Sequence, residues 1–227
     1  MTISLHETCL EYFRRRLSEG WKCISLEGYN AVLLSPDGIR RDIDLRNDVE
    51  TLRPNASGSE TGIASQFPIS GAHWDKVDEE VADGTSTYLY TTSLSYQRDL
   101  FNIVNHSIGS GIINFIKVYV SIKEYATPAG ATHKIAIKTG GTVYEGAEIT
   151  VTNSFALYSE QWNTNPQAGG AWTWAQIDDL QIGVAMRKEA DTAYCTQAYV
   201  EVDYVPAVGI QNKSANMAAK MMARGLI

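Results

Sequence analysis

The segment "GIINFIKVYVSIKEYA", residues 111–126, decides the fold, because apolar and polar residues alternate along most of it. Successive side chains of an extended strand point to opposite faces, so alternation places one set of side chains together. The apolar residues that mostly share one face are Ile112, Ile116, Val118, Val120 and Ile122. The pattern therefore predicts a long strand with one buried face and one wet face, as in antiparallel sheets.

A hairpin signal lies downstream in "HKIAIKTGGTVYEGAEITVT", residues 133–152. Gly140 and Gly141 stand between two β-rich runs, and a two-residue hairpin turn requires positive φ at both central positions. Further β-rich runs are "STYLYTT" (86–92), "FALYSEQW" (155–162), "LQIGVAMR" (180–187) and "YCTQAYVEVDYV" (194–205). Together these runs predict a mainly β fold, with an antiparallel jelly-roll β-sandwich over residues 70–207.

The first 45 residues predict a different, smaller unit, a helix followed by three short β-rich runs. Ser4 and Glu7 have the spacing of a capping box, and Gly20 is placed to end the helix. The apolar stripe of this helix would contain Leu5, Cys9, Tyr12, Phe13 and Leu17. We therefore expect a small α+β unit over residues 1–45, with too few large apolar residues to be stable alone.

Two further segments flank the predicted sandwich. Residues 46–69 are rich in Ser, Gly, Asn, Thr and Glu without apolar periodicity, which is typical of a linker or an extended arm. Residues 208–227 predict a C-terminal helical tail with a methionine-rich apolar side, and methionine adapts to irregular partner surfaces. The candidate partner-contact residues of both appendages are Leu5, Tyr12, Phe13, Met217, Met221 and Met222. The alternative for the tail is packing on its own sandwich.

Three tryptophans lie within the thirteen residues "WNTNPQAGGAWTW", which begin at Trp162. Thr173 and Gln176 have capping-box spacing, so a short helix is expected directly after the loop. Tryptophan buries a large apolar area, and we interpret Trp162 and Trp172 as anchors beneath this irregular loop. Trp174 lies on the surface of the short helix and is the candidate for stacking on a sugar ring.

Four segments between residues 74 and 205 together form a sequence pattern that is also found in a known group of proteins. They are "WDKVDEEVADGTSTYLYTT" (74–92), "IKVYVSIK" (116–123), "HKIAIKTGGTVYEG" (133–146), and the combination of "WNTNP" (162–166), Trp172, Thr173 and "IDDLQIGV" (177–184). This pattern resembles the jelly-roll domains of uncharacterised structural proteins of tailed bacteriophages. The resemblance implies a virion protein made in the host cytoplasm, and it includes no catalytic signature.

The leading functional prediction is therefore a non-enzymatic virion structural protein. We expect a capsid decoration or auxiliary protein that forms a homo-oligomer and docks its two appendages on other virion proteins, such as the major capsid protein. One alternative is a carbohydrate-binding or host-adhesion module on the virion, which predicts exposed aromatic rings that include Trp174 and several of the twelve tyrosines. A second alternative is a tail or head–tail connector component.

Composition and motifs argue against other classes. A net charge of −7 disfavours nucleic acid as a partner, because such binding neutralises phosphates. No apolar run approaches the roughly 18 residues of a membrane span. No nucleophile or phosphate-loop motif is present, and no His/Cys cluster has metal-ligand spacing, so we expect no catalytic residue, cofactor or metal. The acidic stretch at 74–84 is expected to be a solvated loop, with a calcium site as the alternative. The cysteines are expected to be reduced and buried.

Overall fold

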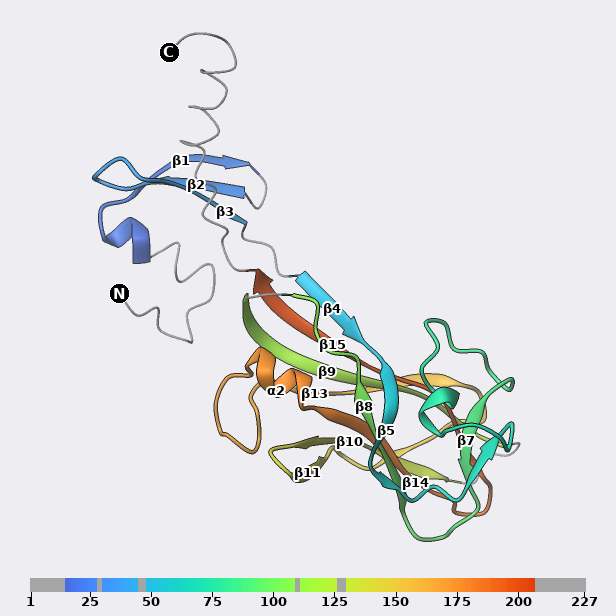
Figure 1. Ribbon diagram of the computed structural model, residues 1–227. Coiled ribbons are helices and arrows are strands. Elements are labelled where there is room, and N and C mark those ends of the chain that lie inside the picture. The colour runs from blue at the N-terminus through green and yellow to red at the C-terminus, as the bar shows by residue number, and fades with distance from the viewer. Residues whose placement is uncertain (1–14, 28–29, 45–47, 109–110, 126–129, 207–227) are drawn as a thin grey trace. The chain divides into compact units, whose positions relative to one another are not determined.

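The computed structural model describes residues 15–27, 30–44, 48–108, 111–125 and 130–206, and the chain divides into two compact units (Figure 1). The smaller unit contains strands β1 (Lys22–Glu27), β2 (Asn30–Leu34) and β3 (Arg40–Asp44). The larger unit contains the described residues from Asp48 to Tyr204, apart from a short piece at the start of β9.

The smaller unit is an antiparallel meander of β1, β2 and β3. Gly38, with φ of 85°, allows the tight turn between β2 and β3, and Leu33 is fully buried in β2. Residues 15–18 are helical, and the earlier part of the predicted helix lies outside the described residues. Within the predicted apolar stripe only Leu17 is among the described residues, and it is exposed. The other stripe residues, including Leu5, Tyr12 and Phe13, lie outside them.

The larger unit is a sandwich of two antiparallel sheets, each with six strands, so the predicted jelly-roll β-sandwich is confirmed. The first, here called the β10 sheet, has the order β11-β10-β14-β8-β5, and β12 also pairs with β10. Its strands are β5 (Pro54–Thr61), β8 (Gln97–Ile103), β10 (Thr132–Thr139), β11 (Thr142–Glu145), β12 (Ile149–Thr150) and β14 (Gln181–Arg187).

The second sheet, here called the β9 sheet, has the order β13-β9-β15-β7-β6, and β4 pairs with β15. Its strands are β4 (Asp48–Leu52), β6 (Ser65–Phe67), β7 (Tyr88–Thr91), β9 (Gly111–Glu124), β13 (Ala156–Trp162) and β15 (Ala193–Pro206). Between η1 (Trp74–Lys76) and β15, the Ala198 amide donates to the Val77 carbonyl at 2.7 Å.

The core of the sandwich lies between the inner faces of the two sheets. The β9 sheet contributes Ile116, Val118, Val120 and Ile122, and the β10 sheet contributes Ile135, Ile137, Ile182, Val184 and Met186, all at most 1% exposed. Removing these side chains from water is the main force that holds the sheets together. The predicted alternation is confirmed from residue 116 to 122. At the start of β9, however, Ile113 rather than Ile112 joins the core.

Residues 48–67 form strands β4, β5 and β6, which differs from the linker or arm expected for residues 46–69. The small polar residues of this segment suit β5, because it is an edge strand whose exposed and half-buried positions alternate. A Cβ atom at Gly58 would lie 2.4 Å from the Leu100 carbonyl oxygen, so this close approach requires glycine. Backbone pairing therefore holds the segment without an apolar repeat.

The local turn predictions are confirmed. Gly140 and Gly141 have φ of 55° and 84°, and Thr139 pairs with Thr142 across the β10–β11 turn. The predicted C-terminal helical tail, with Met217, Met221 and Met222, lies outside the described residues. Among the described residues, no helix is both long enough and apolar enough to cross a membrane.

Candidate functional site on the outer face of the β9 sheet

The outer face of the β9 sheet carries a concentration of aromatic side chains. Leu89 and Cys195 point into the core, so their chain neighbours Tyr88, Tyr90 and Tyr194 point outward. We call the outward set the aromatic face: Phe67, Tyr88, Tyr90, Tyr119, Tyr125, Phe155, Tyr194 and Tyr199. These residues come from five segments of the chain, and the pairing of the strands brings them together.

Strand register aligns the rings of the first group in a row. Phe67 of β6 lies opposite Tyr88 of β7, and the two rings stack with centroids 5.3 Å apart. Tyr90 of β7 lies opposite Tyr194 of β15, with centroids 5.9 Å apart. Tyr125, directly after β9, extends the row, since its ring lies 5.9 Å from that of Tyr194. Cross-strand aromatic pairs of this kind stabilise the sheet and keep the rings in place.

A second group lies further along β9 and β15. The rings of Tyr119 and Tyr199 stack at 4.8 Å with an interplanar angle of 12°. The Lys117 ammonium lies 5.2 Å from the centre of the Tyr119 ring, and the Arg53 guanidinium lies 5.1 Å from that of Tyr199. Burial and a hydrogen bond to Glu201 raise the pKa of Tyr119. This group therefore combines a flat ring pair with two cations.

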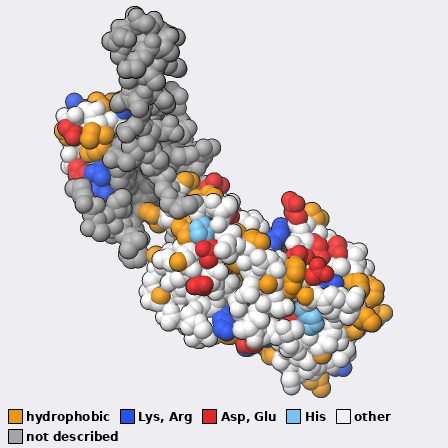
Figure 2. Space-filling view, viewed as in Figure 1, with side chains coloured by type: hydrophobic (Ala, Val, Ile, Leu, Met, Phe, Trp, Pro, Cys, Tyr) orange, Lys and Arg blue, Asp and Glu red, His pale blue; other side chains and the backbone are white. Residues whose placement is uncertain are grey.

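The aromatic face is open to solvent at both ends of the first row. Phe67 is 45% exposed and Tyr125 is 62% exposed, while Tyr88, Tyr90 and Tyr194 are half-buried. Figure 2 shows hydrophobic side chains gathered on the part of the sandwich where β7 lies. Burial raises the pKa of Tyr88 and Tyr194. A tyrosine hydroxyl is protonated at neutral pH with or without this shift, so both can donate hydrogen bonds. A contiguous exposed apolar patch rimmed by polar groups is typical of a binding surface.

Trp162 and Trp172 lie in the structure as expected for anchors. Trp172 is 4% exposed, and its indole nitrogen donates to the Trp162 carbonyl at 3.0 Å. Trp172 belongs to the core and Trp162 packs against it, beneath the loop that joins β13 to α2 (Trp174–Asp178). The structural interpretation of these two tryptophans is confirmed.

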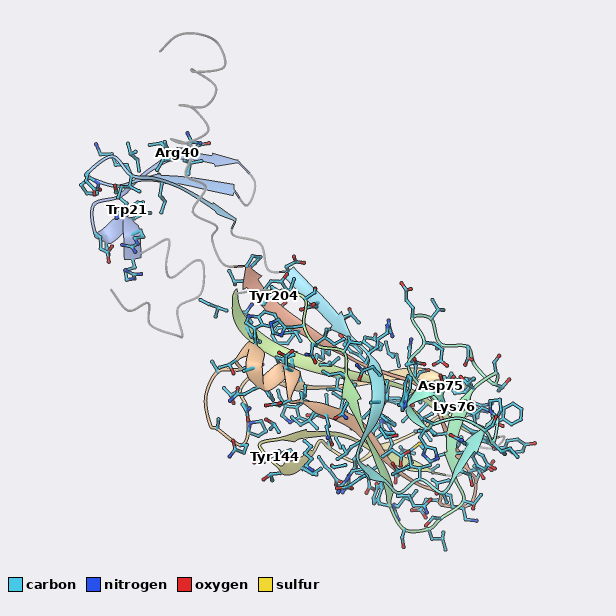
Figure 3. All side chains as sticks on the ribbon, in the orientation of Figure 1. Trp21, Arg40, Asp75, Lys76, Tyr144 and Tyr204 are labelled. Atoms are coloured by element: carbon cyan, nitrogen blue, oxygen red, sulfur yellow. The ribbon has the colours of Figure 1, made fainter. Side chains whose placement is uncertain are left out.

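Trp174 begins α2, and the predicted capping box between Thr173 and Gln176 is present. The Trp174 ring is half-buried, with the His106 ring stacked on it at 4.9 Å. Tyr204, near the end of β15, meets it edge-on at 5.2 Å (Figure 3). Trp174 therefore packs on side chains of this chain and is not part of the aromatic face. Its stacking on a glycan stays a prediction.

The outer face of the β10 sheet has a different character. Arg98 donates to Glu60 at 2.8 Å and to Glu145 at 2.6 Å, and Lys134 also binds Glu145 at 3.2 Å. Against the effect of burial, these two cations hold the pKa of Glu145 below its usual value. A hollow of about 420 Å³ lies here, and its lining includes Tyr96, Arg98 and Glu145. The charged groups at this hollow are already bound to one another.

The acidic stretch at residues 74–84 is held by hydrogen bonds within the chain. The Thr87 hydroxyl lies within hydrogen-bond distance of the carboxylates of Glu79 and Asp83, and the Thr196 hydroxyl donates to Asp83 at 2.9 Å. Burial raises the pKa of Glu79. Within the ranges that the structure describes, no three His, Cys, Asp or Glu side chains are grouped to hold a metal ion.

Two histidine–carboxylate pairs and the described cysteines lie outside the aromatic face. His73 and His106 each contact a carboxylate, Asp99 at 2.5 Å and Asp178 at 2.7 Å, and these pairs tie loops to the sandwich. No sequence signal indicated them, because the partners are 26 and 72 residues apart. Cys195 is buried as expected, and burial raises its pKa to about 12. The expected burial is wrong for Cys23, which is exposed in β1.

No protein-family model matches the chain, and no curated protein matches it. Among solved structures, a xylan-binding domain from Paenibacillus barcinonensis is 14% identical with a TM-score of 0.38, covering 71% of this chain and 97% of that one. A second xylan-binding module is 10% identical with a TM-score of 0.41, covering 71% and 100%. A family 29 carbohydrate-binding module from Piromyces equi is 10% identical with a TM-score of 0.35, covering 68% and 90%.

Proposed function

We propose that the sandwich is a non-catalytic carbohydrate-binding module and that the aromatic face binds the glycan. The observation that carries this proposal is the row of rings from Phe67 through Tyr88, Tyr90 and Tyr194 to Tyr125, which lies across four neighbouring strands and remains open to solvent. Pyranose rings have apolar C–H faces, and these pack well on the faces of aromatic side chains.

Polar groups beside the rings supply the hydrogen bonds that a sugar requires. The outward residues of the edge strand β13 include Ser159 and Gln161, which lie opposite Tyr119 and Lys117 of β9. The protonated hydroxyls of Tyr88 and Tyr194 add donors within the row itself. A mostly aromatic surface with a few polar groups is the usual composition of a ligand site.

The setting that we propose for this module is the virion of a tailed phage, from the sequence resemblance alone. In that setting the sandwich contacts a glycan of the host surface, while the terminal segments dock on other virion proteins such as the major capsid protein. The docking residues proposed for this purpose, Leu5 and Met217 among them, lie outside the described residues. Co-sedimentation of the full chain with purified capsids tests this setting separately from glycan binding.

Affinity electrophoresis of the full chain in gels that contain single polysaccharides tests the binding function. We expect retardation by at least one polysaccharide, and we expect Tyr194→Ala to reduce it about tenfold, since a central ring of a binding surface contributes on the order of 1–2 kcal/mol. Tyr96→Phe, on the opposite outer face, is the matched control and should bind as the wild type does. Equal retardation of Tyr194→Ala and wild type, or none with neutral and acidic polysaccharides alike, would refute the proposal.

A further inference from the structure

Two lysines lie among the rings of the aromatic face. Lys117 and Lys123 are both on β9, six residues apart, and both point outward, since Val118 and Ile122 point into the core. Strand geometry separates their Cα atoms by about 20 Å. The face therefore carries two positive charges along one strand, at a distance that spans several sugar units of a polymer.

Each ammonium group lies beside aromatic rings. Lys123 lies 5.2 Å from the centre of the Phe155 ring and 5.8 Å from that of Tyr194. The Lys117 ammonium lies 5.2 Å from the centre of the Tyr119 ring. The rings restrict where each charge lies, and they leave its remaining hydrogen-bond donors available.

No carboxylate among the described residues forms an ion pair with either lysine. The outward residues of β13, the neighbouring strand, carry no charge; they are Leu157, Ser159 and Gln161. On the other side, Glu201 lies close enough to Tyr119 to raise the pKa of that hydroxyl, and Asp203 accepts a hydrogen bond from Asn114 at 2.6 Å. Asp191, near Tyr194, accepts from the Thr192 amide at 2.7 Å. Asp203 and Asp191 are thus hydrogen-bonded to neutral groups, and neither lysine forms an ion pair among the described residues.

Several cations elsewhere on the sandwich form ion pairs. Arg98, Lys134 and Arg187, on the outer side of the β10 sheet, each form an ion pair with a glutamate. The buried Lys76 binds Asp75 at 3.2 Å (Figure 3). Lys138, on the outer side of the β10 sheet, forms no ion pair either among the described residues and donates to the Ser59 hydroxyl at 2.7 Å. What distinguishes Lys117 and Lys123 among the described residues is that each ammonium lies beside aromatic rings and has no ion pair.

We infer that the aromatic face selects an acidic glycan, a polymer whose sugars carry carboxylates, with Lys123 and Lys117 as the carboxylate-binding residues. This inference rests on the proposed function. A uronate ring packs its C–H face on Tyr194 or Phe155 while its carboxylate accepts hydrogen bonds from the Lys123 ammonium. A second uronate further along the polymer makes the same pair of contacts with Tyr119 and Lys117. Charge-assisted hydrogen bonds favour such carboxylates over neutral sugars of the same shape.

The test compares one polymer in two forms. Polygalacturonate and its carboxyl-reduced form share the same backbone, and only the first carries the acid. Calorimetric titration of the full chain should show tighter binding of the acid form, and 0.5 M salt should reduce the difference, because exposed charges are screened. Lys123→Gln should weaken binding of the acid form about fivefold and leave the reduced form unchanged, as expected for one exposed ion pair.

Lys138→Gln, on the outer side of the β10 sheet, is the matched control and should change neither affinity. Equal affinity for both forms, or an equal loss for both forms in Lys123→Gln, overturns the inference. Binding of dextran sulfate as tightly as polygalacturonate overturns the selection of a carboxylate in favour of charge alone. Binding of a neutral polysaccharide without either form of this polymer overturns the inference while the proposed function stands. Absence of binding to every polysaccharide removes the proposed function itself.

Discussion

The two outer faces of the sandwich share a core but differ in how their polar groups are used. On the β10 sheet, Arg98 joins Glu60 and Glu145, so opposite charges neutralise each other within the surface. On the β9 sheet, aromatic rings stay partly exposed, and Lys123 stands among them without an ion pair in the described part of the chain. The charges of Arg98, Glu60 and Glu145 thus have partners within the first face. The second face keeps exposed aromatic area and a lysine without an ion pair, and both features are typical of a binding surface.

The largest expected effect concerns the stability of the whole sandwich, so it does not distinguish the two outer faces. His133 of β10 points inward against Tyr158 of β13, so it links the two sheets, with ring centroids 4.6 Å apart. Burial lowers its pKa from 6.5 to about 4, against a smaller opposing effect of the Ile149 backbone. The unfolded chain therefore takes up a proton first. Stability is full above pH 6.5 and declines by about 3 kcal/mol as the pH falls to 4.

Urea unfolding of the wild type and His133→Leu at pH 7.5, 6, 5 and 4 checks this effect. The variant lacks the titrating ring, so its stability should fall less with acid. Burial raises the pKa of Asp78 and Glu79, which has the opposite sign, and the difference between the two proteins removes that contribution. Parallel pH curves for both proteins would show that His133 does not limit acid stability.

The next largest expected effect concerns glycan affinity, which depends on the aromatic face alone. Phe67 and Tyr125 are the most exposed rings at the two ends of the row, so their removal costs little packing. The double variant Phe67→Ala/Tyr125→Ala should bind the glycan about 30-fold more weakly, or about 2 kcal/mol, with a melting temperature close to that of the wild type. Calorimetric titration with the polysaccharide that retards the wild type measures the change. A glycan affinity within twofold of the wild type would place the contact elsewhere.

A smaller effect on stability is expected when one cation is removed from each face. Arg98→Met leaves Glu60 and Glu145 without their shared partner and should lower stability by about 1 kcal/mol, or roughly 2–4 °C in melting temperature. Lys117→Met removes a cation with no ion pair and should change stability by less than about 0.5 kcal/mol. Thermal unfolding of both variants tests the contrast. Equal losses would mean that the ion pairs contribute nothing measurable.

The smallest effect concerns Trp174. Phenylalanine at this position keeps a ring against His106, so Trp174→Phe should cost less than about 1 kcal/mol and leave glycan affinity within twofold. A tenfold loss of affinity, measured with the same polysaccharide, would extend the glycan site to α2 and support the sequence-based prediction that Trp174 stacks on a sugar ring.

Local signals in the sequence predicted the parts of the fold that depend on neighbouring residues. The Gly140–Gly141 turn and the Thr173 capping box are set by a few consecutive positions, and both are present. The edge strand β5 could not be predicted in this way. Its sequence, "PNASGSET", has the composition of a linker, and only its pairing with β8, some forty residues later, makes it a strand.

Only part of the aromatic face could be predicted from the sequence. Alternation in "STYLYTT" indicates that Tyr88 and Tyr90 share one side of a strand. It does not indicate that Tyr194, about a hundred residues later, lies opposite Tyr90, because strand order is a tertiary property. The sequence-based choice of Trp174 as the stacking ring followed from the same gap, since the His106 ring that covers it comes from a distant loop.

The segment from β4 to β6 has a mechanical consequence. It starts in the β9 sheet, passes to the β10 sheet at Arg53, and returns to the β9 sheet between Thr61 and Ser65. The covalent chain thus crosses between the two sheets twice within twenty residues. Sliding of one sheet past the other is therefore limited by these covalent connections as well as by the packing of the core.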